Sequence, residues 1–418
     1  MDRHLRFGLI GAGGVGALHL AALRRLEAFG VRVAAIAEPS HACRSRTRSQ
    51  GLVDASIPWR DHYRDLLEGG HDLDVVSIAT PIPFHFEMAR EAMKRGLFVH
   101  LEKPPVPLVQ QLNHLLGLGV ADRVSVGFQF INSRCVQEMK KLVVDGVLGE
   151  IVSIRATGCW PRFDPYYARA AWAGRMTMDG RPVFDGPATN ALAHLVHNIM
   201  HLASPAGFGF VAPSEVTGEL YRARPIESYD CACMRGVFPG GAEFALAVAH
   251  CSREARPFRL RIEGTRGWAL LSGDGDRLET SAGQMLHKPE PTQELIERCY
   301  ERLALRVLDR GARVATQLED TVPYVRATNA MYLSSGGIHD IDGVHVEAFG
   351  PNESRGYHLA GICEALDRVM ETGRLFSELS IPWAAANPAS VRLDSFEYLE
   401  LGGGGPAVGR LQEDLIAG

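Results

Sequence analysis

Apolar residues follow two different patterns along this chain, and the pattern changes close to residue 128. In the first part, short apolar runs such as RFGLIGAG, LDVVSIAT and LFVHLEKP alternate with stretches such as VGALHLAALRRLEAFG, in which apolar residues recur at helical spacing. Strands separated by helices need crossover connections, and these produce a parallel sheet that is buried on both faces. The pattern predicts an α/β domain over residues 1–127, built on a doubly wound parallel sheet.

The second part opens with a helical pattern, CVQEMKKLVVDG, and then consists mainly of strand-like runs joined by tight turns. The runs are EIVSIRATG, EVTGELYRA, YDCACMRGVF, GAEFALAVAHC, PFRLRIEG and GWALLSG. Glycine-containing turns at 239–241 and 264–267 are typical of hairpins. We therefore expect an α+β domain over residues 128–400 with a large open antiparallel sheet. A further helix is expected over 356–372, and a flexible glycine-rich tail over 401–418.

The composition is that of a globular protein, and it argues against several classes of function. At 418 residues the chain is too long for one ordinary core, and its net charge of −5 offers no basic field to nucleic acid. Its apolar runs are too short to span a membrane, and the N-terminal MDRHLRFGLIGAGG lacks the layout of a signal peptide. The eight cysteines show no paired CxxC spacing, so we expect reduced thiols and a cytoplasmic protein.

A glycine-rich turn lies between the first strand-like run and the first helical pattern. It fits the spacing G-x-G-x-x-G with the residues Gly11, Ala12, Gly13, Gly14, Val15 and Gly16. In a strand–turn–helix unit such glycines permit a tight turn and let the backbone approach a pyrophosphate at the positive end of the helix. The motif alone is weak, but its place between a strand and a helix predicts a dinucleotide site.

Glu38 indicates which dinucleotide to expect. It ends the second strand-like run, 22 residues after Gly16, where a carboxylate accepts hydrogen bonds from the ribose hydroxyls. A carboxylate at that position repels a 2′-phosphate, so the sequence favours NAD over NADP. Arg44, Arg46 and Arg48 offer the alternative, because they could bind the phosphate, although their spacing is also that of a solvated helix face.

The stretch DLDVVSIATPIPFHFEMAREAMKRGLFVHLEKPP, residues 72–105, resembles the signature of the glucose–fructose oxidoreductase/inositol dehydrogenase/rhizopine catabolism (Gfo/Idh/MocA) family. The resemblance covers residues 5 to about 200 by motif and continues to about 385 in pattern. It implies an NAD(P)-dependent oxidoreductase of sugars or polyols, with a Rossmann domain followed by an open-sheet domain. It also implies a homodimer or homotetramer formed through the C-terminal sheet.

The same resemblance implies roles for residues at the ends of two strands. The family's Glu-Lys-Pro motif, here Glu102 and Lys103 with the next proline, supplies a lysine near the nicotinamide and the substrate. Thr80 and Pro81 would line the nicotinamide half of the groove, and His85 would open the next helix beside them. Lys103 could instead be an ordinary surface lysine before a turn. Its place at the carboxyl end of a strand, where doubly wound sheets bind ligands, favours the functional interpretation.

The stretch TNALAHLVHNIMH, residues 189–201, concentrates polar side chains in an otherwise apolar helical pattern. On one continuous helix, Asn190, His194, His197 and His201 would form a single stripe. Such a helix is expected to be buried, with its stripe facing either a polar cavity or backbone partners in the core. A metal site is disfavoured, because His194 and His201 would lie about 10 Å apart along the helix.

The resemblance implies an acid/base role for this stretch, since many family members carry Asp-x-x-x-His on a helix with another aspartate three residues later. Here His194 matches, while Asn190 replaces the first acid and His197 the second. Removing hydride from a carbinol carbon requires a base for the hydroxyl proton, and imidazole titrates near neutrality. A cationic Lys103 beside the same oxygen would stabilise the developing negative charge. Asn190 and His197 would have supporting roles, with no metal involved.

The segment DPYYARAAWAGR, residues 164–175, is a candidate wall for the substrate. Tyr167, Arg169 and Trp172 offer the aromatic faces and fork-shaped donors that bind sugars. The same residues are enriched in subunit contacts and in loops packed on a sheet, and both alternatives stay open.

Three functions are compatible with these residues. The first is an NAD-dependent dehydrogenase acting on a secondary hydroxyl of a sugar, polyol or derivative. The second is a redox-neutral glycoside-cleaving enzyme that passes through a keto-sugar and uses His197 or a tyrosine of 164–175 as an extra acid/base. The third is a non-catalytic dinucleotide-binding sensor or scaffold, for which Asn190 in place of an acid is the best support.

Overall fold

The computed structural model describes residues 4–394 and 396–399, and within them the chain forms two compact units. Unit one comprises the chain up to Val106, then Gln111–Asn132 and Glu290–Thr321, and unit two comprises the remaining described residues. This division differs from the expected 1–127 and 128–400, because residues 290–321 return to the first unit. The expected flexible tail at 401–418 lies outside the described residues.

Unit one is built on a six-stranded parallel sheet, as its alternating pattern predicted. The strand order is β3-β2-β1-β4-β5-β6, and the strands are β1 (Leu5–Ile10), β2 (Val31–Ala37), β3 (Trp59–Arg60), β4 (Val75–Ile78), β5 (Phe98–Leu101) and β6 (Val124–Val126). Strands β4, β5 and β6 are buried along their whole length, which is why they read as continuous apolar runs. The order reverses between β1 and β4, and doubly wound sheets bind ligands at the carboxyl ends of such strands.

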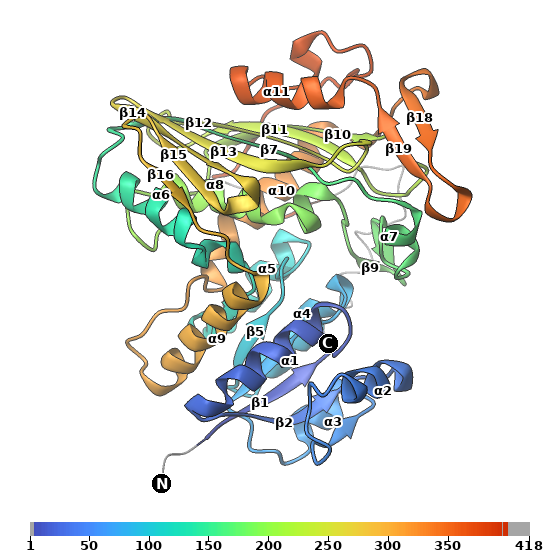
Figure 1. Ribbon diagram of the computed structural model, residues 1–418, viewed down its shortest axis with the longest axis vertical. Coiled ribbons are helices and arrows are strands. Elements are labelled where there is room, and N and C mark those ends of the chain that lie inside the picture. The colour runs from blue at the N-terminus through green and yellow to red at the C-terminus, as the bar shows by residue number, and fades with distance from the viewer. Residues whose placement is uncertain (1–3, 395, 400–418) are drawn as a thin grey trace. The chain divides into compact units, whose positions relative to one another are not determined.

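Helices cover this sheet, and one of them comes from far along the chain. They are α1 (Val15–Arg25), α2 (His41–Ser49), α3 (Tyr63–Glu68), α4 (His85–Lys94), α5 (Val109–Gly117, in unit one from Gln111 on) and α9 (Thr292–Leu308). Figure 1 shows α9, in orange, beside the dark blue α1. Ile296, Tyr300 and Leu303 of α9 share a buried cluster with Phe7 of β1 and Leu23 of α1. Helix α9 therefore completes the core of the first unit.

Unit two is built on a ten-stranded sheet, in the order β16-β15-β14-β13-β7-β12-β11-β10-β17 with β20 also pairing β10. The strands are β7 (Ile151–Cys159), β10 (Glu215–Arg222), β11 (Cys231–Val237), β12 (Glu243–Ala249), β13 (Arg256–Gly264), β14 (Gly267–Ser272), β15 (Arg277–Thr280), β16 (Met285–His287), β17 (His339–Asp340) and β20 (Val391–Arg392). The two hairpins expected from glycine-containing turns are confirmed, between β11 and β12 and between β13 and β14. The sheet is mixed rather than purely antiparallel, because β12 pairs with β7 in parallel.

Helices lie on both faces of this sheet. They are α6 (Arg134–Val144), α7 (Asp164–Ala168), α8 (Ala193–Leu202), α10 (Val322–Ser335) and α11 (Ile362–Thr372), with the small ribbons β8–β9 (Thr177–Met178, Arg181–Pro182) and β18–β19 (Val346–Phe349, Gly356–Leu359). Figure 1 shows α11 on one side of the sheet and α8 and α10 on the other. The helix expected over 356–372 begins only at Ile362, since Gly356–Leu359 pairs as a strand.

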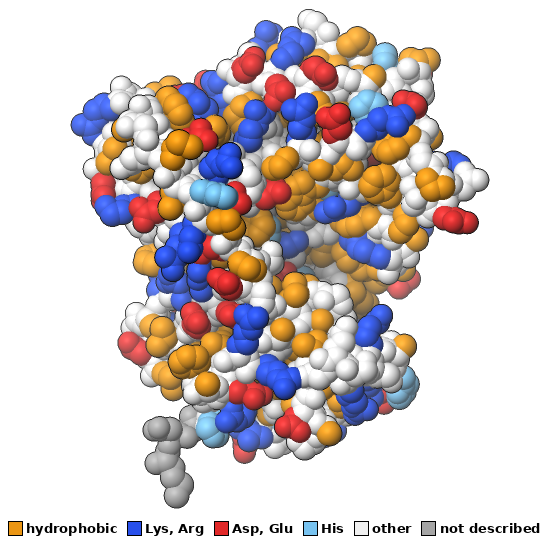
Figure 2. Space-filling model, viewed as in Figure 1, with side chains coloured by type: hydrophobic (Ala, Val, Ile, Leu, Met, Phe, Trp, Pro, Cys, Tyr) orange, Lys and Arg blue, Asp and Glu red, His pale blue; other side chains and the backbone are white. Residues whose placement is uncertain are grey.

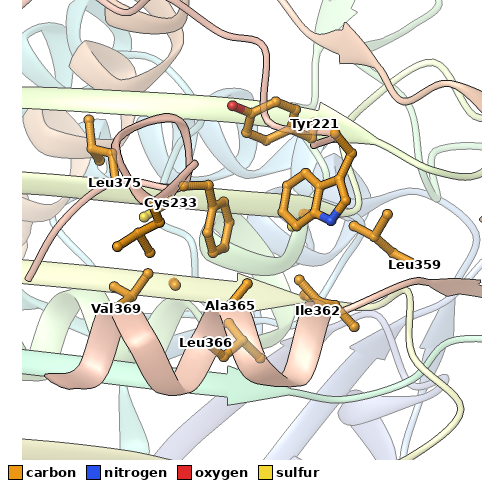
Figure 3. Close-up of a cluster of buried hydrophobic side chains, with 14 of the residues drawn as sticks. Tyr221, Cys233, Leu359, Ile362, Ala365, Leu366, Val369 and Leu375 are labelled. Carbon is orange, nitrogen blue, oxygen red and sulfur yellow. The ribbon is translucent and has the colours of Figure 1, made fainter. Parts of the chain in front are cut away.

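The face under α11 is an apolar cluster rich in small residues (Figure 3). Cys231 and Cys233 of β11 lie on this face, under α11 and the segment that follows it, which carries Phe376 and Trp383. Two cysteines that alternate along one strand point to the same face and here pack as small apolar side chains. Helix α11 packs on β7 and β12, and self-association through this sheet stays a prediction.

Candidate functional site

The glycine loop follows β1 directly and leads into α1. Gly11 has a φ of +87°, and a Cβ there would lie 2.6 Å from the carbonyl oxygen of Ala79. A Cβ on Gly16 would collide with the carbonyl oxygen of Gly11, and Gly14 caps α1 with a φ of +54°. The backbone therefore takes a turn that side chains would block, as a loop that approaches a pyrophosphate requires.

Glu38 comes directly after β2, and its side chain lies against this loop. Its Oε2 accepts a hydrogen bond of 3.0 Å from the backbone N–H of Ala12, and its Oε1 accepts one of 2.9 Å from that of Ser40. The residue is only 8% exposed. A buried carboxylate fixed beside the glycine loop is the arrangement expected for binding ribose hydroxyls.

The arginines that offered the NADP alternative lie on α2. Arg44 donates to the carbonyl oxygens of Glu38 and Arg60 and forms an ion pair with Asp61. Arg48 lies over the ring of Trp59, 5.3 Å from its centroid. The guanidinium of Arg44 thus already holds the strand ends together, which favours a structural role over phosphate binding.

The loops after β4 and β5 are joined by His85, the first residue of α4. Its Nδ1 lies 2.8 Å from the carbonyl oxygen of Pro104, and its Nε2 lies 2.9 Å from that of Thr80. The side chain is buried, and burial lowers its pKa. Pro81 follows Thr80 and starts a short 3₁₀ turn, so the two motifs named by the resemblance are adjacent in the fold.

Glu102 and Lys103 follow β5 at the same edge of the sheet. One carboxylate oxygen of Glu102 accepts a 3.0 Å hydrogen bond from Nε2 of His19, and the other accepts a 3.1 Å bond from the backbone N–H of Lys103. Burial would raise the pKa of Glu102, but the hydrogen bond and charge of His19, aided by Lys103, hold that pKa at about 2. Lys103 is partly buried, and its backbone is fixed by an ionised neighbour.

In unit two, the histidine-rich helix differs from expectation at its start. A π-helical turn over Pro187–Ala191 precedes α8, and the N–H of Leu192 donates to the carbonyl of Pro187. Asn190 lies in this turn, so Asn190 and the histidines do not lie on one continuous α-helix, as the expected stripe assumed. A π turn adds a residue and shifts the phase of the side chains, and a 3.6-residue period cannot show this in the sequence.

The three histidines of α8 are buried and differ in surroundings. His194 is 5% exposed and His197 is fully buried. Burial, with the charges of His201 and His194, lowers the pKa of His197 well below its usual value, and its ring lies 4.7 Å from that of Phe210. His201 packs on the same phenylalanine and its Nδ1 lies 3.1 Å from the carbonyl oxygen of Gly209. These surroundings favour a packing role for His197.

Asp185 is a buried carboxylate that sequence reasoning missed. Its Oδ1 accepts a 2.8 Å hydrogen bond from the side-chain amide of Asn190, and its Oδ2 accepts a 2.7 Å bond from the backbone N–H of Gly174. Asn190, which replaces the family's aspartate, is therefore hydrogen-bonded to a carboxylate, that of Asp185. A lone aspartate in an irregular segment gives no periodic signal, so the sequence offered no means of finding it.

The segment 164–175 forms α7 and the turn after it. The guanidinium of Arg169 lies 3.6 Å from the ring centroid of Tyr166 and 4.8 Å from that of Trp172. Tyr167 lines a hollow of about 400 Å³ together with Arg175, Glu227 and small side chains. Of the three residues predicted to bind substrate, Tyr167 lines the hollow, whereas Arg169 and Trp172 stack on each other.

Among the described residues, one group offers ligand atoms of three His, Cys, Asp or Glu side chains within 4.8 Å of one another: His19, His100 and Glu102. Both ring nitrogens of His19 already have partners, Glu102 and Tyr300. These contacts describe a hydrogen-bond network more readily than a metal centre.

The visible surface charge and the helices can be compared with the expectation of no nucleic-acid or membrane partner. On the face shown in Figure 2, basic and acidic side chains are interspersed rather than gathered into one basic patch. In the part of the chain that the structure describes, every helix is too short or too polar to cross a membrane.

Comparison with protein-family models matches two successive parts of the chain. Residues 5–128 match an oxidoreductase family with an NAD-binding Rossmann fold, and residues 136–270 match the GFO/IDH/MocA C-terminal domain. The two matches together cover more than half of the chain.

Individual relatives are more distant. The rhizopine catabolism protein MocA of Rhizobium meliloti is 30% identical over 177 residues, which are 42% of this chain and 53% of that protein. Glycosyl hydrolase family 109 protein 3 of Phocaeicola vulgatus is 33% identical over 140 residues, 31% of this chain and 25% of that protein. The chain spans about half the length of the curated relatives it matches.

A levoglucosan dehydrogenase solved in complex with NADH has a similar structure. Its TM-score is 0.70 at 17% identity, over 79% of this chain and 97% of that one. At this identity the likeness concerns the fold.

Proposed function

Because the chain belongs to the GFO/IDH/MocA oxidoreductase family, we propose that it is an NAD-dependent dehydrogenase of a secondary hydroxyl in a sugar, polyol or sugar derivative. The observation that carries this proposal is the placement of Lys103. It follows β5 at the carboxyl edge of an NAD-binding sheet, and its backbone is held by the ionised Glu102. A scaffold that only stores a dinucleotide would not need a fixed lysine there.

The proposed roles follow from the chemistry of a carbinol carbon. NAD, when bound, supplies the hydride acceptor. Lys103 donates a hydrogen bond to the hydroxyl oxygen, which lowers the pKa of that hydroxyl and stabilises the charge that develops on it. His194 accepts the proton as a neutral imidazole. Asn190, held by Asp185, supports the start of α8, and His197 packs against Phe210.

The cofactor-binding residues have separate tasks. Gly11, Gly13 and Gly16 allow the backbone to approach the pyrophosphate, and Glu38 accepts the ribose hydroxyls. Thr80, Pro81 and His85 shape the nicotinamide half. The residues present fit NAD, because the buried carboxylate of Glu38 stands where NADP would bring its phosphate.

A polyhydroxylated substrate is supported by the side chains of unit two. The stacked Arg169 and Trp172 present an aromatic face with a fork of donors, and Tyr167 lines the neighbouring hollow. Aromatic faces bind the apolar sides of sugar rings, while guanidinium groups bind their hydroxyls.

Replacing Lys103 by methionine tests the assignment. With a panel of sugars, polyols and glycosides followed by NADH absorbance and product mass, turnover should fall by about 10²-fold or more. The affinity for NADH, measured by fluorescence, should stay close to that of the unmodified protein. Lys94→Met, at an exposed position near the end of α4, is the matched control. Retained turnover in Lys103→Met would refute the role.

A second candidate is a redox-neutral glycosidase, favoured by the similarity to the family 109 glycosyl hydrolase. A ring carbon is oxidised to a ketone, which acidifies the adjacent C–H and allows the glycosidic bond to be eliminated. Water then adds, and the hydride returns to the ketone. Tyr167 would serve as the extra acid, because burial raises the pKa of its hydroxyl and keeps it protonated, whereas burial lowers the pKa of His197 well below its usual value. Glycoside cleavage with no net NADH would favour this candidate over the first.

A further inference from the structure

Unit one contains four buried polar side chains, from four separate elements, that are linked to one another and to Lys103 by hydrogen bonds. Ser77 lies on β4, Tyr300 on α9, His19 on α1, and Glu102 at the end of β5. Each is at most 5% exposed. Polar groups this deeply buried cost stability unless they are paired, so their pairing is a specific feature of the sequence.

Hydrogen bonds connect these side chains to the backbone of Lys103. The hydroxyl of Tyr300 is bonded to that of Ser77 and lies 2.8 Å from Nδ1 of His19. Nε2 of His19 donates to one oxygen of Glu102, because an ionised carboxylate can only accept. The other oxygen of Glu102 accepts the backbone N–H of Lys103. The hydroxyl of Tyr300 is therefore connected to the Lys103 backbone through two intervening side chains.

The backbone of Gly127 lies close to the carboxylate of Glu102. A Cβ on Gly127 would lie 2.7 Å from Oε1 of Glu102 and 3.1 Å from its carboxyl carbon. A side chain at position 127 would therefore press against the carboxylate and displace it. The rings of His19 and Tyr300 also pack edge to face, with centroids 5.6 Å apart. The network is thus held by shape as well as by hydrogen bonds.

We propose that Tyr300 and His19 are positioning residues for Lys103. They orient the Glu102 carboxylate, and that carboxylate fixes the backbone from which the lysine side chain extends. The catalytic consequence rests on the proposed function, in which Lys103 meets the substrate hydroxyl. The structural consequence, a restrained Lys103 backbone, does not depend on it.

Tyr300→Phe removes the hydroxyl and keeps the ring that packs on Phe7 and His100. We expect kcat to fall on the order of tenfold, with the KM for NAD and the affinity for NADH nearly unchanged. Tyr63→Phe is the matched control, because Tyr63 is a buried tyrosine of the same unit that donates to Glu87 instead. An equal loss in both variants, or a loss of NADH affinity in step with kcat, would overturn the positioning role.

Hydrogen exchange of the Lys103 amide tests the proposal without any substrate. Pro104 and Pro105 have no N–H, and the first two residues of a peptide lose their label during analysis, so a peptide spanning residues 101–105 reports mainly on the amide bonded to Glu102. We expect this amide to exchange severalfold faster in Tyr300→Phe than in the unmodified protein and in Tyr63→Phe. Unchanged exchange would overturn the proposal, whatever the turnover. Suppose that Lys103→Met retains turnover, while the amide exchanges faster in Tyr300→Phe as expected. The proposed function would then fail, and the positioning role of the network would stand.

Two further measurements keep the test decisive. If Tyr300→Phe does not fold, Ser77→Ala removes the outermost hydroxyl and should speed the same amide by a smaller factor, and unchanged exchange would again refute the idea. Elemental analysis of the purified protein addresses the alternative of a metal held by His19, His100 and Glu102. One equivalent of tightly bound metal would overturn the network in favour of that centre.

Discussion

Lys140→Met tests how the helix that carries His194 is held. Lys140 lies on α6, is 3% exposed, and donates hydrogen bonds of 2.6 Å to the carbonyl oxygens of His201 and Ser204. These carbonyls belong to the C-terminal end of α8 and the residues after it, where helices leave carbonyl groups without partners. Methionine has a similar length but no hydrogen-bond donor. Each carbonyl group left without a partner should therefore lower the free energy of unfolding by about 1–3 kcal/mol.

The pH dependence gives this prediction its sign. Burial lowers the pKa of Lys140 from its usual 10.5 to about 7. Between those two values the unfolded chain binds more protons than the folded one, so the free energy of unfolding rises with pH by about 1.4 kcal/mol per unit. A neutral amine keeps two N–H donors, enough for both carbonyls. The stability advantage over Lys140→Met should therefore grow by about 2–3 kcal/mol between about pH 7.5 and about pH 9.5.

Urea unfolding at the two pH values, followed by tryptophan fluorescence, measures this difference. Other groups titrate in both proteins, so their effects cancel when the two variants are compared at each pH. Lys141→Met is the control, because the side chain of Lys141 is exposed and pairs with Asp145 at the surface. We expect the stability difference between this variant and the unmodified protein to show no such pH dependence. A stability difference for Lys140→Met that does not change with pH would refute the reasoning. It would show that the helix end stabilises the ammonium enough to restore its ordinary pKa.

Four further substitutions test the site. Glu38→Ser should narrow the preference for NAD over NADP in fluorescence titrations, because the phosphate would no longer face a carboxylate; equal affinity of the unmodified protein for both would assign specificity to the arginines of α2. His194→Ala should lower kcat by about 10²-fold or more, while His197→Ala should mainly lower the melting temperature, and equal losses of kcat would contradict the separate roles. Trp172→Ala should raise the KM for substrate at nearly constant kcat. A change in molar mass by light scattering instead would identify Trp172 as a subunit contact.

Periodicity was sufficient for much of the fold. The apolar runs of β1, β4 and β5 marked a parallel sheet because strands buried on both faces contain few polar residues. Glycine-containing turns located two hairpins of the second sheet. The parallel pairing of β7 with β12 could not be seen, because pairing depends on which strands become neighbours in space.

The candidate site was predictable where chemistry is local in the sequence. Glu38 was predicted to bind the ribose hydroxyls because it ends the second strand 22 residues after Gly16, and in the structure its carboxylate accepts a hydrogen bond from the N–H of Ala12. The π turn at Asn190 was missed because one extra residue in a turn leaves the apolar pattern nearly unchanged. Tyr300 was missed for a different reason. It looks like any aromatic residue on an amphipathic helix, and only the tertiary fold brings it next to His19.

The return of α9 to the first unit affects how this protein can be synthesised and divided. On the ribosome, β1–β6 are complete long before residues 290–321 emerge, and the second sheet's strands β7–β16 are made in between. Until then Phe7 and Leu23 lack the apolar side chains of α9 that cover them in the finished unit. Apolar surface exposed in this way on an unfinished chain promotes aggregation. A fragment that ends at residue 132 would carry the same exposed surface, so an isolated cofactor domain has to join residues 4–132 to residues 290–321.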